Sequence, residues 1–135
     1  MALLNIKIML PKDAAFTMHQ LADCEFLSKV FATKIIELDN TGRKPRRLVD
    51  MRGHQFVEEI IQLSDTKLVY QIVGNGPIQQ HQGQINYISN SAKPHLQYLI
   101  EGQSNTWVPN WLLKVVMFYD FKLAGKRLRK LLYER

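Results

Sequence analysis

Residues 68–88 read LVYQIVGNGPIQQHQGQINYI, and this stretch decides which fold the chain can adopt. Apolar and polar residues alternate up to Val73, as in a β-strand with one buried face, and the alternation resumes after Pro77. The Gly-Asn-Gly-Pro segment between them has two interpretations. It is either a sharp bend within one long strand, because glycine relaxes the backbone limits and proline removes a ladder donor, or an ordinary hairpin loop from Gly74 to Pro77.

Further strands joined by tight turns are predicted on the N-terminal side of this stretch. Turn residues at 40–42, 53–55 and 64–67 separate the apolar segments KIIEL, RRLVDM, FVEEIIQL and LVYQIV. A three-residue turn at 53–55 would place Met51 opposite Val57. The pattern predicts an antiparallel meander.

The apolar residues also predict how these strands pair. A tight turn at residues 64–67 would place Ile61 opposite Tyr70 and Glu59 opposite Ile72. A shift by one residue would exchange the two faces of a strand, so the apolar residues select this register. The expected inward face carries Glu59 and Arg47 as its ionisable groups and otherwise consists of Val49, Met51, Val57, Ile61, Leu63, Leu68, Tyr70 and Ile72.

One more strand is predicted after the quoted stretch. HLQYLI places Leu96, Tyr98 and Ile100 on one side, where they can pair with residues such as Tyr87 on the preceding strand. His81 then falls on the same side of the sheet, towards a strand end.

The two flanks of the chain contain the helical signals. After a first strand near residues 4–10, residues 12–31 carry an apolar stripe at helical spacing, and Asp23 allows a break into two short helices. A long helix is predicted from Pro109 onward. Its first half, WLLKVVMFYDF, is apolar almost all round, so we expect it to be covered on more than one side.

These elements carry short motifs in a fixed order: Gly42, RRL at 46–48, Gly53, EII at 59–61, LSD at 63–65, LVYQI at 68–72, Gly76 and Pro77, and HQGQINYI at 81–88. The series resembles the pattern of the polyketide cyclase/dehydrase-like branch of the START and birch-pollen-allergen superfamily, also called SRPBCC. The resemblance spans essentially the whole chain.

The resemblance implies an α+β helix-grip fold. In this fold a curved antiparallel sheet of about seven strands wraps around a long C-terminal helix, with two short helices after the first strand. The resemblance also implies a cavity between the sheet and the last helix. Because a strand that wraps a helix must bend, we expect Gly74, Gly76 and Pro77 to bend one strand rather than to close a hairpin.

The net charge of +6 is unevenly distributed. Residues 114–135 carry seven Lys or Arg residues against two acidic ones. A second basic cluster comprises Arg43, Lys44, Arg46 and Arg47. Such clusters can contact an anionic surface, although a solvated helix face and a charged hairpin tip explain them more simply. No specific nucleic-acid partner is predicted.

Composition and spacing exclude several classes of protein. The only cysteine, Cys24, cannot form an internal disulfide, which favours a reducing, cytoplasmic location. The four histidines show no metal-ligand spacing and no Gly-rich loop leads into a helix, so neither a metal nor another cofactor is expected. The apolar stretches are shorter than a membrane span. Residues 1–135 are expected to form a single domain.

Glu59 is the most prominent candidate for a functional side chain. Burying a carboxylate is costly unless it is paired or protonated, so Arg47 or a ligand should compensate Glu59. Glu59 with Arg47 or His81 is thus a candidate acid–base group, and the simpler alternative is that Glu59 forms a salt bridge with Arg47 at the cavity rim or lies at a sheet edge open to water. The ligand-binding candidates are Glu59 together with Val49, Met51, Ile61, Tyr70, Ile72, Tyr87, Tyr98, Met117 and Phe121.

Three functions are compatible with these residues. The first is binding of a small hydrophobic ligand, such as a lipid, an isoprenoid or an aromatic polyketide-like compound, in the cavity. The second is a cyclase or dehydratase reaction that uses Glu59 with Arg47 or His81. The third is a ligand-free interaction module that uses the basic C-terminal helix. We favour the first, because the spacing secures no acid–base pair.

Overall fold

The computed structural model describes residues 2–11, 16–38, 44–51, 53–74, 76–89 and 93–133. Its elements in chain order are β1 (Ala2–Met9), the 3-10 helix η1 (Met18–Ala22), α1 (Cys24–Phe31), β2 (Lys34–Glu37), β3 (Arg46–Met51), β4 (His54–Leu63), β5 (Lys67–Val73), β6 (Ile78–Ile88), β7 (His95–Ser104) and α2 (Asn110–Tyr133). The seven strands form one antiparallel sheet in the order β1-β7-β6-β5-β4-β3-β2.

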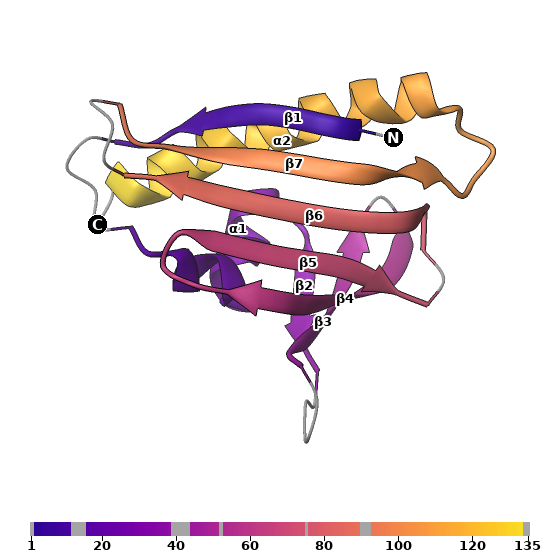
Figure 1. Cartoon of the computed structure of the whole chain (residues 1–135), viewed down its shortest axis with the longest axis horizontal. Helices are drawn as coiled ribbons and strands as arrows, with labels where there is room; N and C mark the ends of the chain where they lie inside the picture. Colours follow the sequence, from indigo (N-terminus) through magenta and orange to yellow (C-terminus); the bar gives the residue numbers. More distant parts are fainter. Residues whose placement is uncertain are drawn as a thin grey trace.

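The long helix α2 runs along one face of this sheet (Figure 1) and contacts β1, β7 and α1. The strands β2, β3 and β4 turn away from the direction of β1 and β7, so the sheet is curved (Figure 1). The core lies between the sheet and the helices. Its most completely buried large side chains are Met18, Leu21, Leu68, Leu96, Ile100 and Leu128. This arrangement confirms the predicted α+β helix-grip architecture.

The two short helices meet at Asp23, as predicted. The Asp23 Oδ1 atom accepts hydrogen bonds from the backbone N–H groups of Glu25 at 3.0 Å and Phe26 at 3.4 Å. Asp23 is therefore the N-cap of α1, and a capping carboxylate satisfies N–H groups that the first helical turn leaves unpaired. Ala32 ends α1 in the left-handed conformation, with φ of 51°.

The expectation that residues 68–88 form one bent strand is wrong. Residues 74–77 connect two separate antiparallel strands, β5 and β6, which pair with Leu68 opposite Ile85 and Tyr70 opposite Gly83. The hairpin was the alternative interpretation of the same residues. The irregularity lies within β6 instead, between Gln79 and Gln82, where the register against β7 shifts.

The predicted register of β4 is correct only next to its turn. Leu63 pairs with Leu68 as expected, but a bulge between Ile60 and Gln62 places Ile60, not Ile61, opposite Tyr70. An extra residue in one strand reverses which residues face inward beyond it. The predicted pairing therefore fails for the whole N-terminal half of β4.

The turn between β3 and β4 also shifts the pairing with β3 towards lower residue numbers in β4 than predicted. Met51 pairs with His54 and Val49 with Phe56, so the turn has two residues rather than three. The inward residues of β3 are those predicted, whereas those of β4 alternate with the predicted ones. Phe56, Glu58 and Ile60 take the inward positions expected for Val57, Glu59 and Ile61.

The other half of the predicted meander is confirmed. Tyr87 pairs with Leu96 and Ile85 with Tyr98 in the β6–β7 ladder. His81, on the same strand, is buried as the pattern suggested.

Gly83 makes room for the Tyr70 ring across the β5–β6 ladder. A Cβ at Gly83 would lie 2.3 Å from the Tyr70 Cζ atom. We expect Gly83→Ala to lower the free energy of unfolding by about 1–3 kcal/mol, measured by denaturant unfolding followed by circular dichroism. In a Tyr70→Leu background the same change should cost much less, because the ring is gone. An equal loss in both backgrounds would contradict this account.

Candidate functional site

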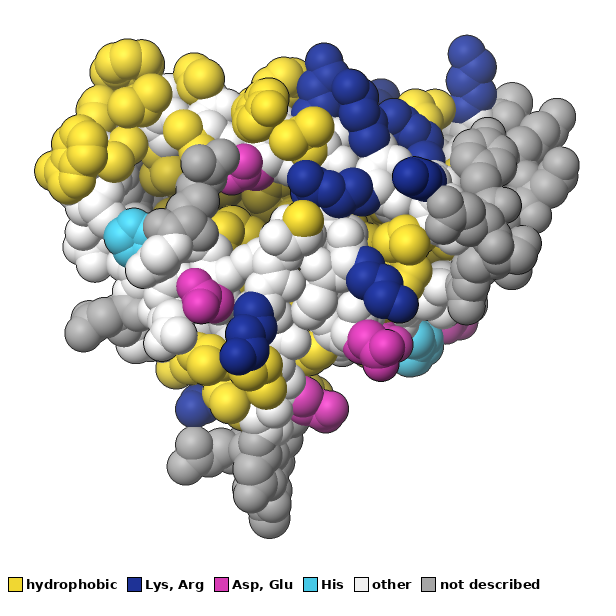
Figure 2. Space-filling model, turned by 180° about the vertical axis from the view of Figure 1, so that it is seen from behind, with side chains coloured by type: hydrophobic (Ala, Val, Ile, Leu, Met, Phe, Trp, Pro, Cys, Tyr) yellow, Lys and Arg dark blue, Asp and Glu magenta, His cyan; other side chains and the backbone are white. Residues whose placement is uncertain are grey.

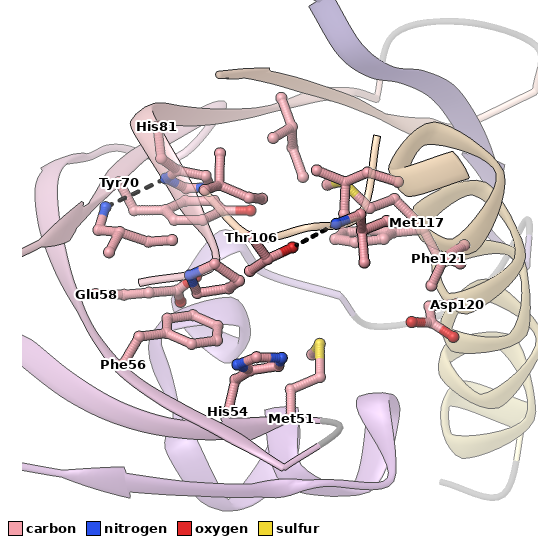
Figure 3. Close-up of a pocket in the computed structure, with 17 residues that line it drawn as sticks. Met51, His54, Phe56, Glu58, Tyr70, His81, Thr106, Met117, Asp120 and Phe121 are labelled. Carbon is pink, nitrogen blue, oxygen red and sulfur yellow. Dashed lines mark hydrogen bonds between the residues drawn. The ribbon is translucent and has the colours of Figure 1, made fainter. Parts of the chain in front are cut away.

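A cavity of about 260 Å³ lies between the sheet and α2. Side chains of β4 and β5, among them Phe56, Glu58 and Tyr70, face Met117 and Phe121 of α2 across it (Figure 3). Most of the wall is apolar. The lining side chains with polar groups among the described residues are His54, Glu58, Tyr70, His81, Thr106 and Asp120.

Six of the predicted site residues line this cavity: Met51, Tyr70, Ile72, His81, Met117 and Phe121. Three more, Arg47, Val49 and Tyr98, line a smaller adjoining space of about 50 Å³ that shares part of the wall. The structure thus brings together residues from β3, β5, β6, β7 and α2 that lie far apart in the sequence.

Three predicted residues do not line either space. Glu59 lies on the opposite face of β4, where its Oε2 atom accepts a hydrogen bond from Arg46 Nε at 2.8 Å. Ile61 is the extra residue of the bulge between Ile60 and Gln62 and lies near Pro45. Tyr87 packs edge-on against Phe16, with ring centroids 5.1 Å apart. Placing Glu59 in the cavity was wrong, because the bulge and the short turn reverse the faces of β4.

Glu58 occupies the place predicted for Glu59 and forms a buried ion pair with Arg47. Arg47 Nε donates to Glu58 Oε1 at 2.9 Å, and the two side chains are 6% and 13% exposed. Arg47 Nη1 also donates to the backbone carbonyl of Leu21 at 3.0 Å. Burial acts to lower the pKa of Arg47, but the Glu58 carboxylate outweighs it, so the pKa is raised and Arg47 stays charged.

Two tyrosines stand beside this ion pair. The Arg47 guanidinium lies 5.4 Å from the centroid of the Tyr70 ring. Burial raises the pKa of Tyr70 well above its usual range, and the nearby Glu58 carboxylate raises it further. Burial likewise raises the pKa of Tyr98. Both hydroxyl groups are therefore neutral at physiological pH and cannot serve as phenolate bases.

His81 lies above Tyr70, with ring centroids 5.5 Å apart. Its Nδ1 atom accepts a hydrogen bond from the backbone N–H of Ile72 at 3.2 Å, drawn as a dashed line in Figure 3. The imidazole thus accepts a hydrogen bond that a backbone carbonyl of the neighbouring strand would normally accept, just beyond the end of the β5–β6 pairing. Burial lowers the pKa of His81 to about 4, so the ring is neutral at physiological pH.

The sequence prediction missed Glu58, Phe56 and His54 on β4 and several residues of α2. Two pairs of adjacent charged residues, Arg46–Arg47 and Glu58–Glu59, could have indicated the correct pairing of β3 with β4. Each arginine in fact lies opposite one glutamate, and that pairing requires the two-residue turn. On α2 the spacing of three and four residues identifies the lining side chains Leu113, Val116, Met117, Asp120 and Phe121.

The basic cluster around Pro45 is not a free cationic patch. Arg46 and Arg47 are both held by glutamates of β4, and Arg47 is buried. Lys44 is exposed, and Arg43 lies outside the described residues.

The described residues also bear on two other kinds of site, metal centres and membrane spans. No group of three or more His, Cys, Asp or Glu residues among them is placed to hold a metal ion. Among these residues, no helix combines the length and hydrophobicity that crossing a membrane would require.

Comparison with solved structures finds the same architecture at low sequence identity. A START superfamily protein from Mycobacterium smegmatis aligns with a TM-score of 0.74 and 12% identity, over 97% of this chain and 97% of that chain. The chain has the helix-grip fold. For Ara h 8.0201 the helix-grip match has a TM-score of 0.68 and 11% identity, over 98% of this chain and 97% of that one.

A conserved protein from Geobacillus kaustophilus shows the same helix-grip fold, with a TM-score of 0.71 and 15% identity over 96% of this chain and 93% of that chain. The sequence matches no family model and no curated protein. At these identities the likeness is one of fold. The cyclase/dehydrase-like branch stays a prediction from the motifs.

Proposed function

We propose that this protein binds a small, uncharged hydrophobic molecule in the cavity between the sheet and α2. The observation that carries this proposal is the cavity itself, about 260 Å³ of space with a mainly apolar wall and a few polar groups. Ligand sites typically combine these features, with volumes of about 300–1,000 Å³, so the space here suits a compact ligand.

The polar wall groups favour a ligand that donates hydrogen bonds and carries no negative charge. Glu58 and Asp120 contribute carboxylates, and among the described lining residues there is no Lys or Arg. His81 is neutral because of its lowered pKa. An anionic head group would therefore lie near two carboxylates, and Arg47, the cation that pairs with Glu58, does not line the cavity. A hydroxyl or amine donor would instead find acceptors.

These features narrow the ligand classes that the motifs suggest. Of a lipid, an isoprenoid and an aromatic polyketide-like compound, the size and polarity of the cavity favour a hydroxylated isoprenoid or phenolic compound. The reaction proposed through Glu59 has no support, because Glu59 lies outside the cavity and pairs with Arg46. Glu58 is at the wall, but Arg47 holds it in an ion pair. The geometry therefore supports binding rather than acid–base catalysis.

A pair of fluorescent probes tests the proposal. Phenylnaphthylamine is neutral with one N–H donor, and anilinonaphthalenesulfonate has the same rings with an added anion. We expect the neutral probe to bind in a saturable way and the sulfonate to bind at least about tenfold more weakly.

Two neighbouring residues of α2 provide a matched pair of variants. Val116 lines the cavity, whereas Val115 is mainly exposed. Val116→Phe should weaken binding of the neutral probe at least about tenfold by filling the space, and Val115→Phe should change it less than about twofold. Equal effects of the two substitutions, or tighter binding of the sulfonate, would overturn the proposal.

A further inference from the structure

The first half of α2 and the segment before it expose large apolar side chains. Trp107 is 89% exposed and Trp111 67% exposed, and the side chains of Val115, Phe118 and Tyr119 are each more than half exposed. The helical spacing places Trp111, Val115, Phe118 and Tyr119 on one face of α2, and Trp107 precedes the helix by three residues. We refer to these five residues as the apolar face of α2.

This face is not needed for the core. The opposite side of α2 packs against the sheet and α1 through Met117, Phe121, Ala124, Leu128 and Leu132. The sequence prediction that the apolar half of this helix is covered on more than one side is therefore wrong for this chain by itself. Exposed apolar groups of this size commonly mark a surface that meets a partner or a membrane.

The same exposed side of α2 becomes basic in its second half. Lys122, Lys126 and Lys130 are exposed, and Arg129 is half-buried. Lys122 Nζ lies 5.9 Å from the Phe118 ring centroid, so the apolar and basic parts are contiguous. Figure 2 shows hydrophobic side chains gathered at one upper corner and Lys and Arg side chains beside them along the upper edge.

We propose that this outer side of α2 docks on a lipid bilayer that contains anionic lipids. Tryptophan and tyrosine favour the boundary between head groups and acyl chains, where an apolar ring and a polar edge are both satisfied. Lysines next to an anionic leaflet are attracted to it. The proposal does not depend on the ligand proposed above.

A bilayer fits this surface better than a second copy of the chain. Among the described residues of α2 the only acidic side chain is Asp120, which lines the cavity. A self-association through the outer side would bring lysines together without a carboxylate from α2 to pair with them. An anionic membrane instead provides an apolar layer for the aromatic groups and negative charge for the lysines.

Docking would bring the ligand cavity next to the membrane. Thr106 and Val108, the two neighbours of Trp107 in the sequence, both line the cavity. The Val108 N–H donates to Thr106 Oγ1 at 3.2 Å, which helps to fix the turn that presents Trp107.

The protein's own fluorescence tests the proposal. Trp107 and Trp111 are the only two tryptophans in the chain, and both lie on the apolar face. Vesicles of phosphatidylcholine mixed with phosphatidylglycerol should shift their emission to shorter wavelength, and vesicles of phosphatidylcholine alone should do so at least about tenfold less effectively. No shift with the anionic vesicles would overturn the proposal.

Variants locate the contact by vesicle co-sedimentation. Lys122→Gln with Lys126→Gln should weaken binding about 30-fold, from the attraction lost per lysine. Lys34→Gln with Lys44→Gln removes the same charge from exposed positions outside α2 and should change binding less than about threefold.

Trp107→Ala with Trp111→Ala should weaken binding at least about tenfold, and Ile36→Ala, at an exposed apolar residue of β2, should have little effect.

Other outcomes would assign the surface to a different partner. A shift that grows with protein concentration without vesicles, together with an increase in size, would show self-association. A shift with an RNA oligonucleotide but not with vesicles would show a nucleic-acid contact. Equal weakening by the two lysine pairs would show only a general charge effect. Each of these results would overturn the membrane proposal and leave the probe-binding experiment unaffected.

Discussion

Arg47→Ala is expected to lower the free energy of unfolding by about 3–5 kcal/mol, whereas Arg46→Ala should lower it by only about 0–1 kcal/mol. The two arginines are adjacent and make ion pairs of nearly equal length, 2.9 and 2.8 Å. They differ in burial, since the Arg47 side chain is 6% exposed and that of Arg46 is 27% exposed. Removing Arg47 would leave the Glu58 carboxylate without its cation in the protein interior.

Denaturant unfolding followed by circular dichroism measures both variants. A third variant distinguishes the cost of leaving one charge unpaired from the cost of removing the whole ion pair. Arg47→Met combined with Glu58→Leu removes both charges and should recover most of the stability, because no charge is then left unpaired. If Arg46→Ala proved as damaging as Arg47→Ala, the greater burial of Arg47 would not be what decides the cost.

Acid should destabilise the protein through His81. The pKa of His81 is about 4 in the folded state, against about 6.5 for a solvated histidine. Between these values the unfolded chain binds a proton and the folded chain does not, so stability falls as the pH is lowered from about 6.5 to about 4. The contribution lost over this window is up to about 3 kcal/mol.

The matched variant is His81→Gln, whose side-chain oxygen can still accept the hydrogen bond from the Ile72 N–H. Stability measured from pH 7 to pH 4 should fall less steeply in this variant than in the unchanged protein. Glu58, Asp120, His54 and Tyr70 line the same cavity and are present in both proteins, so the difference isolates His81. Parallel pH profiles would contradict the buried, neutral state of the imidazole.

Much of the fold could be predicted from residue patterns that act locally. Asp23 interrupts the helical region because its short carboxylate caps the N–H groups of the next helix. Tyr87 and Leu96 pair as predicted because the β6–β7 ladder is regular from Gln82 to Ile88, beyond the irregularity in β6. The Gly-Asn-Gly-Pro segment was recognised as a break, but only the β5–β6 pairing distinguishes a hairpin from a bend.

The candidate site was predicted less completely than the fold. Tyr70, Ile72, Met117 and Phe121 were identified because buried faces are predictable from periodicity, and they line the cavity. An unbroken alternation predicts Glu59 rather than Glu58 at the cavity wall, because the pattern does not reveal the bulge after Ile60.

The helical flanks, the break at Asp23 and the apolar faces of β3, β5 and β7 were thus determined by the sequence alone, because each depends on contacts between near neighbours. Only the tertiary structure decided which of two consecutive glutamates faces the cavity and which side of α2 remains exposed. A bulge and a two-residue turn reverse the faces of a strand, and they form where long-range packing makes them favourable. The exposure of Trp111 likewise depends on what the rest of the chain leaves uncovered.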